Sequence, residues 1–92
     1  MIVRISTEGQ YRVSSAVLDQ LNEIDNRIVQ IVGSGDSESF KKALDEMLSL
    51  VRSKGSPVAS SDLLASDIIL PAPDVTLEDA RDLFSGEGLV PS

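Results

Sequence analysis

Residues 14–55 read SSAVLDQLNEIDNRIVQIVGSGDSESFKKALDEMLSLVRSKG and contain two apolar stripes with helical spacing, from which the architecture follows. Within each stripe an apolar residue recurs every three or four positions, which puts the stripe on one face of a helix. The first stripe is Val17, Leu21, Ile24, Ile28 and Ile31, and the second is Phe40, Leu44, Met47 and Val51. Two such helices with a short connection predict an antiparallel helical hairpin.

Capping signals mark the ends of both helices. Each helix starts beside a side chain that can accept a hydrogen bond from the free backbone N–H groups, and each ends at glycine. The expected bounds are Ser14 or Ser15 to about Val32, stopped by Gly33-Ser34-Gly35, and then 37–53, capped by Asp36 and stopped by Lys54-Gly55. The helical hairpin therefore occupies residues 14–55.

The segment before the helices, residues 1–13, predicts a β-hairpin. Met1–Ser6 mixes β-branched residues with one charge, and Tyr11–Val13 is a second short strand. Gly9, in the turn between them, can adopt a positive φ. Since a two-stranded hairpin is marginal alone, we expect it to pack on the helices.

The segment after the helices, residues 56–92, predicts a strand, a proline-rich bend and a short helix. Ser66–Leu70 reads as the strand, because Pro71 ends it. Thr76 can cap a helix of about ten residues, with Asp79 where a capping box has its acid. The predicted fold is a single α+β domain over residues 1–92. Its further strand would join the hairpin in a small antiparallel sheet, with the helices on one face.

The composition excludes several classes of function. The chain has no cysteine and no histidine, so it lacks thiolate chemistry, the commonest general base and the commonest transition-metal ligand. No segment approaches the roughly 20 apolar residues that cross a bilayer. A net charge of −7 opposes binding to nucleic acid and to anionic membranes. We expect a cytoplasmic protein without enzymatic activity, cofactor, metal or direct membrane insertion.

Most of the negative charge lies in residues 56–92. This segment has one base, Arg81, and seven acids, which gives a net charge of −6 out of the total of −7. It also contains apolar runs at 68–70 and 89–90, so it reads as an acidic surface over a packed segment. Such a surface favours a basic or amphipathic partner.

Other interpretations of the charged and apolar residues remain open. Paired carboxylates such as Glu78 and Asp79 could act as acid and base, but acids in the first turn of a helix favour its positive end. Asp25 lies on the line from Leu18 to Val32, where it could either pair with a basic partner residue or face water. The apolar surplus could be buried internally or form a homodimer.

Six short strings along the chain resemble one family. They are MIVRI at 1–5, EGQY at 8–11, LNEIDN at 21–26, SDIILP at 66–71, DVTLED at 74–79 and EGLVP at 87–91. Together they are similar to the small phage-shock-protein-A-associated proteins of prokaryotes. The resemblance implies a non-enzymatic accessory protein of the membrane-remodelling coiled-coil protein PspA in the envelope-stress response. It implies no catalytic or ligand-binding residues.

The sequence thus predicts a protein-interaction module that docks on a helical, partly basic partner, for which a PspA-like coiled-coil protein is the candidate. Attachment to a membrane would come only through that partner. A homodimerising structural protein and a transcriptional regulator are the alternatives. The predicted contact residues are Asp67, Asp74, Glu78, Asp82 and Glu87, with Leu89 and Val90 as an apolar anchor.

Overall fold

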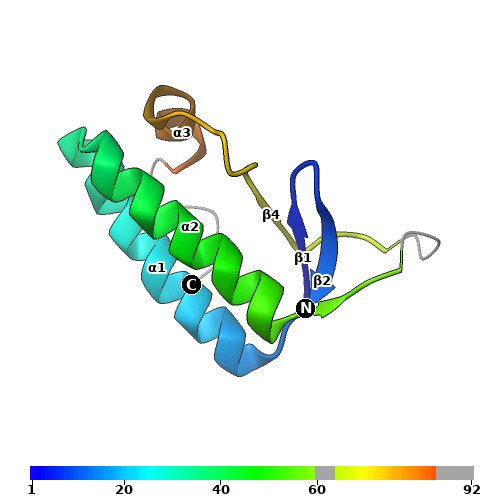
Figure 1. Ribbon diagram of the computed structural model, residues 1–92. Helices are drawn as coiled ribbons and strands as arrows, with labels where there is room; N and C mark the ends of the chain where they lie inside the picture. Colours follow the sequence, from blue (N-terminus) through cyan, green and yellow to red (C-terminus); the bar gives the residue numbers. More distant parts are fainter. Residues whose placement is uncertain (60–63, 85–92) are drawn as a thin grey trace.

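A computed structural model describes residues 1–59 and 64–84 of the chain. Within these residues a β-hairpin is followed by two long helices, two short strands and a short third helix (Figure 1). The elements are β1 (Ile2–Ile5), β2 (Gly9–Arg12), α1 (Ser15–Ser34), α2 (Ser37–Lys54), β3 (Ser56–Pro57), β4 (Ile68–Leu70) and α3 (Leu77–Leu83). The predicted α+β class, the β-hairpin, the helical hairpin and the short last helix are confirmed.

The caps that define the helical hairpin are those that the sequence indicates. The Val17 backbone N–H donates to Ser14 Oγ at 3.3 Å, so Ser14 rather than Ser15 caps α1. At the start of α2, the Ser39 N–H donates to Asp36 Oδ1 at 3.1 Å. Between the helices, Gly35 has a φ of 78° and donates its N–H to the last carbonyls of α1.

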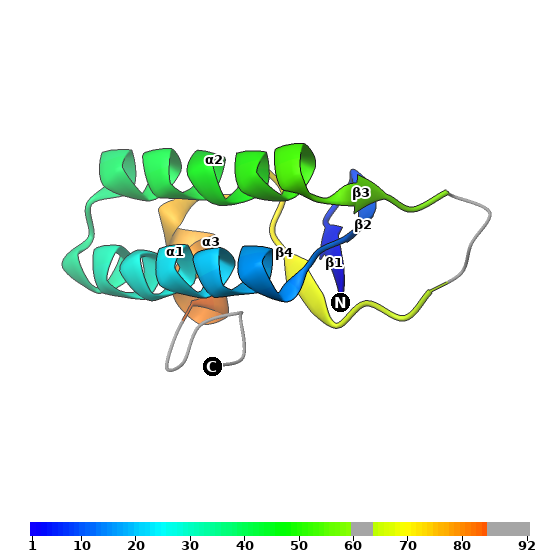
Figure 2. The same cartoon turned by 90° about the horizontal axis from the view of Figure 1, so that it is seen from below.

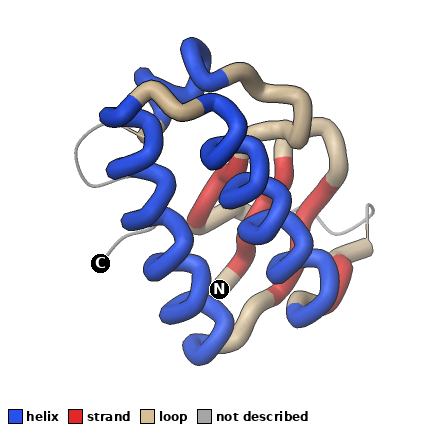
Figure 3. The backbone as a smooth tube through the Cα atoms, turned by 60° about the vertical axis from the view of Figure 1, so that its left-hand side comes forward, coloured by secondary structure: helices blue, strands red, loops and turns tan. Residues whose placement is uncertain are grey.

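The core lies between the helical hairpin and one face of the sheet (Figure 3). Alternate strand residues such as Val3, Ile5 and Leu70 are fully buried, whereas Arg4 and Ile69 are exposed. On the helices, the buried apolar residues are Val17, Leu21, Ile24, Ile28 and Val32 of α1, and Phe40, Ala43, Leu44, Met47, Leu48 and Val51 of α2. The predicted stripes are therefore the core, apart from Ile31, which is half-buried.

The sheet has four strands in the order β3-β2-β1-β4 and is mixed, which corrects the predicted small antiparallel sheet. β4 joins the hairpin as expected, but it pairs parallel to β1, with Val3 opposite Ile68. The chain reaches β4 from β3 at the opposite edge of the sheet, and a crossover connection of this kind allows a strand to run parallel to its neighbour. β3, which the sequence does not predict as a strand, pairs antiparallel with β2. Pro57 is tolerated there because β3 is an edge strand.

The surplus apolar residues of the helices pack inside the molecule. Leu18, Val29 and Leu50 are half-buried against the core, and Val32 and Leu48 are buried. Among the described residues, the large apolar side chains that are exposed are Met1, Ile69 and Leu83, and none of them lies on α1.

The sequence left two interpretations of Asp25 open: it could pair with a basic partner residue, or it could face water. The second is wrong, because Asp25 is buried. Its side chain is fully buried on α1, among the apolar residues of the first helix. Nearby, Asn22 Oδ1 is buried without a hydrogen-bond partner in the described part of the chain.

α3 packs toward the end of the helical hairpin where Gly35 joins α1 to α2, whereas the strands lie toward the other end (Figure 2). Ala80 and Phe84 are buried. The Phe84 ring meets the Phe40 ring of α2 edge to face, with centroids 6.2 Å apart and an interplanar angle of 74°. This contact fixes α3 against α2 and so creates the groove described next.

Candidate partner-binding groove

An open groove of about 600 Å³ lies between the first half of α2 and the segment that leads into α3. Its α2 wall carries charged side chains, and its opposite wall is largely apolar. The lining residues are Ser37, Glu38, Phe40, Lys41, Lys42 and Asp45 on α2, and Val75, Thr76 and Leu77 on the other side. Phe40 is almost fully buried, whereas Val75 and Leu77 are half-buried and remain accessible.

Local sequence positions the wall formed by residues 75–77. Pro73 is the second residue of a turn in which the Val75 N–H donates to the Ala72 carbonyl at 3.1 Å. Proline favours that position because its φ is already suited to it. Thr76 then caps α3, since the Asp79 N–H donates to its Oγ1 at 3.2 Å. The predicted cap is confirmed, and it leaves Leu77 in the first turn, facing the groove.

The α2 wall starts at the helix cap that Asp36 forms. Hydrogen bonds from the Ser39 backbone N–H and the Ser39 hydroxyl hold the pKa of Asp36 below its usual value. Lys41 and Lys42 follow on the same helix, and neither forms an ion pair with any residue that the structure describes. Glu38 and Asp45 balance their charge on this wall.

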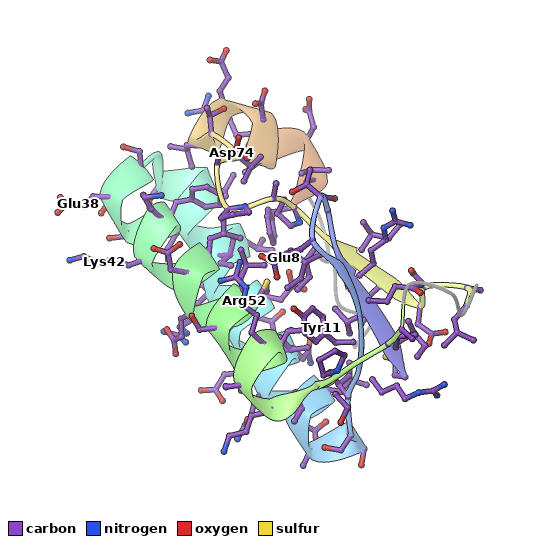
Figure 4. The ribbon with its side chains drawn as sticks, turned by 45° about the vertical axis from the view of Figure 1, so that its right-hand side comes forward. Glu8, Tyr11, Glu38, Lys42, Arg52 and Asp74 are labelled. Atoms are coloured by element: carbon purple, nitrogen blue, oxygen red, sulfur yellow. The ribbon has the colours of Figure 1, made fainter. Side chains whose placement is uncertain are left out.

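The rim of the opposite wall is acidic. Asp74 and Glu78 flank the lining residues 75–77 and are exposed. Figure 4 shows Asp74 at the same end of the molecule as Glu38 and Lys42 of α2. The groove therefore lies between one wall whose charges balance and one rim with two acids and no base.

The predicted contact residues divide into three groups. Asp74, Glu78 and Asp82 lie together on α3 or directly before it. Asp67 lies apart from them, at the start of β4, where its Oδ2 accepts a hydrogen bond of 2.8 Å from the Ile2 N–H. Glu87, Leu89 and Val90 lie outside the described residues. The structure thus brings three of the predicted acids together and gives Asp67 a contact that holds β4 beside β1.

Sequence reasoning missed the apolar residues at this end of the molecule. Val75 and Leu77 belong to the groove, and Leu83 on α3 is 44% exposed. Arg81, the base of the acidic segment, has a guanidinium nitrogen 3.8 Å from the position that a Cβ on Gly35 would occupy. It therefore lies beside the carbonyl end of α1, where a cation is favoured.

A second charged cluster joins the turn of the β-hairpin to α2. Arg52 Nε donates to Glu8 Oε2 at 2.9 Å, and the Tyr11 hydroxyl donates to the same oxygen at 3.2 Å (Figure 4). The hydrogen bond from Arg52 is the main reason that the pKa of Glu8 is lowered. Burial is the main reason that the pKa of Tyr11 is raised. We interpret this cluster as a structural contact, because it ties two elements together on the surface.

Within 1–59 and 64–84, no three acidic side chains are grouped so that they could hold a metal ion. No helix in this part of the chain has the length and apolar character needed to span a bilayer.

The fold and the groove define a small α+β protein that offers an open, charged and partly apolar groove at one end. The chain belongs to the PspA-Associated protein family, PspAA, whose family model matches residues 1–92. The resemblance drawn from the six short strings is confirmed. No curated protein and no solved structure matches the chain.

Proposed function

We propose that this chain is a non-enzymatic, cytoplasmic accessory module that docks on a PspA-like coiled-coil protein and acts with it in the envelope-stress response. One observation carries the proposal: two exposed acids, Asp74 and Glu78, directly flank the residues 75–77 that form the largely apolar wall of an open groove. The family name supports a PspA partner. Contact with a membrane would come through that partner.

The groove suits a helical partner. Helix-binding proteins accept the apolar face of an amphipathic helix in a groove and read it through anchors at about every third or fourth residue. Here Val75 and Leu77 supply accessible apolar surface, and Asp74 and Glu78 stand at the rim. Acids at a rim accelerate encounter with a basic partner more than they tighten the complex.

The non-enzymatic part of the proposal rests on chemistry. The chain has no histidine and no cysteine, so a reaction would have to use carboxylates, lysines or hydroxyls. Glu78 and Asp79 lie in the first turn of α3, where the helix dipole favours their charged form. That position accounts for both acids without catalysis.

The experiment is a binding measurement between this chain and the purified PspA protein from the same organism, by calorimetry over a range of salt concentrations. The test variant is Asp74→Asn/Glu78→Gln. The matched control is Asp19→Asn/Glu23→Gln, which removes the same charge from the exposed side of α1. We expect the test variant to bind roughly two- to tenfold more weakly at low salt and the control to match the unchanged chain. No complex at low salt would refute the proposal.

A further inference from the structure

The sheet has an outer face, which the helices do not cover (Figure 3). Because side chains alternate along a strand, the neighbours of the buried Val3 and Ile5 point away from the helical hairpin. The residues on this outer face are Ile2, Arg4, Gln10, Arg12, Asp67 and Ile69. Arg4 and Arg12 are exposed, and Ile69, at 58%, is the most exposed large apolar side chain that the structure describes. The outer face therefore combines cationic and apolar groups.

The register places the two arginines at diagonal positions. Arg4 is paired with Gln10 across the hairpin, and Arg12 lies two residues further along β2. Diagonal neighbours on one face of an antiparallel pair lie roughly 7–8 Å apart, within reach of long side chains. The Gln10 amide does not compete for a ligand, because it donates to the Leu64 carbonyl at 2.7 Å and to Ser66 Oγ at 2.8 Å. The two guanidinium groups are thus neighbours on an exposed surface.

One acid shares the outer face with the arginines. Asp67 lies diagonally across from Arg4, but its Oδ2 accepts the hydrogen bond from the Ile2 N–H. Neither Arg4 nor Arg12 forms an ion pair with any residue in 1–59 or 64–84. With two bases and one acid, the outer face has a net side-chain charge of +1, whereas the whole chain has −7. Because neighbouring cations repel each other, carboxylates of a ligand would stabilise this face.

Apolar surface lies beside each arginine. Ile69 is the register partner of Arg4, and Ile2 is the register partner of Arg12. Ile69 is exposed and Ile2 is half-buried, so a ligand with apolar groups beside its carboxylates would remove apolar surface from water. An anionic membrane and a nucleic acid fit this face less well than an acidic protein segment, because the net charge of −7 opposes the approach of large polyanions.

We propose that the outer face binds an acidic amphipathic helix of a partner protein. Arg4 and Arg12 pair with two carboxylates one helical turn apart, and apolar residues of the helix cover Ile2 and Ile69. Side chains at i and i+4 of a helix have Cβ atoms about 6 Å apart, which is close to the spacing of diagonal residues on a sheet. Arginine suits this contact, because its planar guanidinium can donate two parallel hydrogen bonds to one carboxylate. The outer face is separate from the groove, since it is turned away from α2.

The test compares two synthetic helical peptides by calorimetry. They share their leucines and differ at two positions one turn apart, which hold glutamate in one peptide and glutamine in the other. We expect the glutamate peptide to bind the unchanged chain roughly fivefold more tightly at low salt, and the difference to shrink as salt is added. Equal affinities at low salt, or no binding of the glutamate peptide, would overturn the proposal.

Amide signals in NMR spectra show where the glutamate peptide binds. We expect shifts in β1, β2 and β4, and none at residues 75–77 of the groove. Arg4→Gln and Arg12→Gln should each weaken binding roughly threefold. The matched control is Arg27→Gln, which removes the same charge from an exposed ion pair with Glu46 on the helical hairpin. Shifts confined to the groove, or an equal loss of affinity in the control, would contradict a site on the outer face.

Vesicles that contain phosphatidylglycerol distinguish a membrane from an acidic protein segment. We expect the chain to stay in solution when the vesicles are sedimented. If the chain sediments with them and Arg4→Gln/Arg12→Gln abolishes this, the outer face binds lipid and the proposal is wrong.

The groove variant separates this proposal from the proposed function. Asp74→Asn/Glu78→Gln should not weaken binding of the glutamate peptide, because neither residue lies on the outer face. If that peptide behaves as expected and PspA does not bind the chain, the proposed function fails and the outer-face site stands. If PspA binds and the glutamate peptide does not, the outer-face site fails and the proposed function stands.

Discussion

Gly55 is the residue at which the smallest change should have a large effect. A Cβ there would lie 2.5 Å from the Val51 carbonyl oxygen and 3.1 Å from Tyr11 Cβ, so the end of α2 would have to move away from β2. We expect Gly55→Ala to lower the free energy of unfolding by about 1–3 kcal/mol. Gly33→Ala is the control, because nothing lies within 4 Å of its added Cβ. Because Gly33 lies within α1, Gly33→Ala should raise the free energy of unfolding by about 0.5–1 kcal/mol. Urea unfolding measures the free energy of unfolding of both variants. Equal changes in Gly55→Ala and Gly33→Ala would contradict the close approach of Gly55 to Val51 and Tyr11.

The ion pair of Glu8 and Arg52 should make stability depend on pH. The pKa of Glu8 is lower in the folded chain than its ordinary value of 4.5, so the unfolded chain binds more protons in that range. Its contribution is present above pH 4.5 and is lost as the pH falls through the folded pKa. With side chains 39% and 32% exposed, the pair contributes at most about 1 kcal/mol.

Unfolding measured with and without Glu8→Gln isolates this contribution. The unchanged chain should be the more stable one near neutral pH, and the two should converge in acid. A difference that persists at a pH well below the folded pKa would show that the substitution acts through packing rather than charge. Asp36, whose pKa is also lowered, is the same in both chains, so its titration cancels.

At the scale of elements, the helices and the β-hairpin could be predicted, whereas strand β3 and the direction of β4 could not. α1 and α2 are long enough for apolar periodicity and caps to agree, so their bounds were predicted to within two residues. β3 and β4 have two and three residues, which is too short for alternation to show a register or a direction. The burial of Asp25 could not be predicted for a related reason. Whether a residue at the edge of an apolar stripe is buried depends on which elements pack beside it in the folded chain.

α3 should depend on a single aromatic contact. A helix of seven residues is too short to be stable alone, so its packing on α2 must hold it. We expect Phe84→Ala to remove about 3–5 kcal/mol of packing and to expose the amides of α3 to hydrogen exchange. α1 and α2 should keep their protection, since their shared core remains. Leu83→Ala is the control, because Leu83 is 44% exposed and its loss should change stability by less than about 0.5 kcal/mol.

Hydrogen exchange at α3 also tests whether the groove depends on this helix. The PspA protein should bind the Phe84→Ala variant weakly, because Val75 and Leu77 would no longer be held opposite α2. If the α3 amides in that variant stay protected, the edge-to-face contact with Phe40 does not anchor the helix.

At the scale of the whole molecule, the sequence predicts the charge of the candidate site but not its shape. The count of acids in residues 56–92 was enough to predict an acidic surface, and Asp74, Glu78 and Asp82 do lie together. The groove needs α2 and the 75–77 segment to meet in space, which no local pattern records. For the same reason, Asp67 was grouped with acids that lie elsewhere in the fold.

The whole molecule should be a monomer at micromolar concentration. The described large apolar side chains that are exposed are Met1, Ile69 and Leu83, and they belong to different parts of the fold. The surplus apolar residues of α1 pack inward, and a net charge of −7 makes copies repel one another. Sedimentation equilibrium should therefore give a mass near 9.8 kDa at moderate salt. A dimer would contradict this expectation, and Ile69→Ser would then test whether it forms at β4, because β4, like β3, is an edge strand of the described sheet and a second copy could extend its unpaired backbone. Loss of the dimer in that variant would place the contact at the β4 edge rather than on the helices.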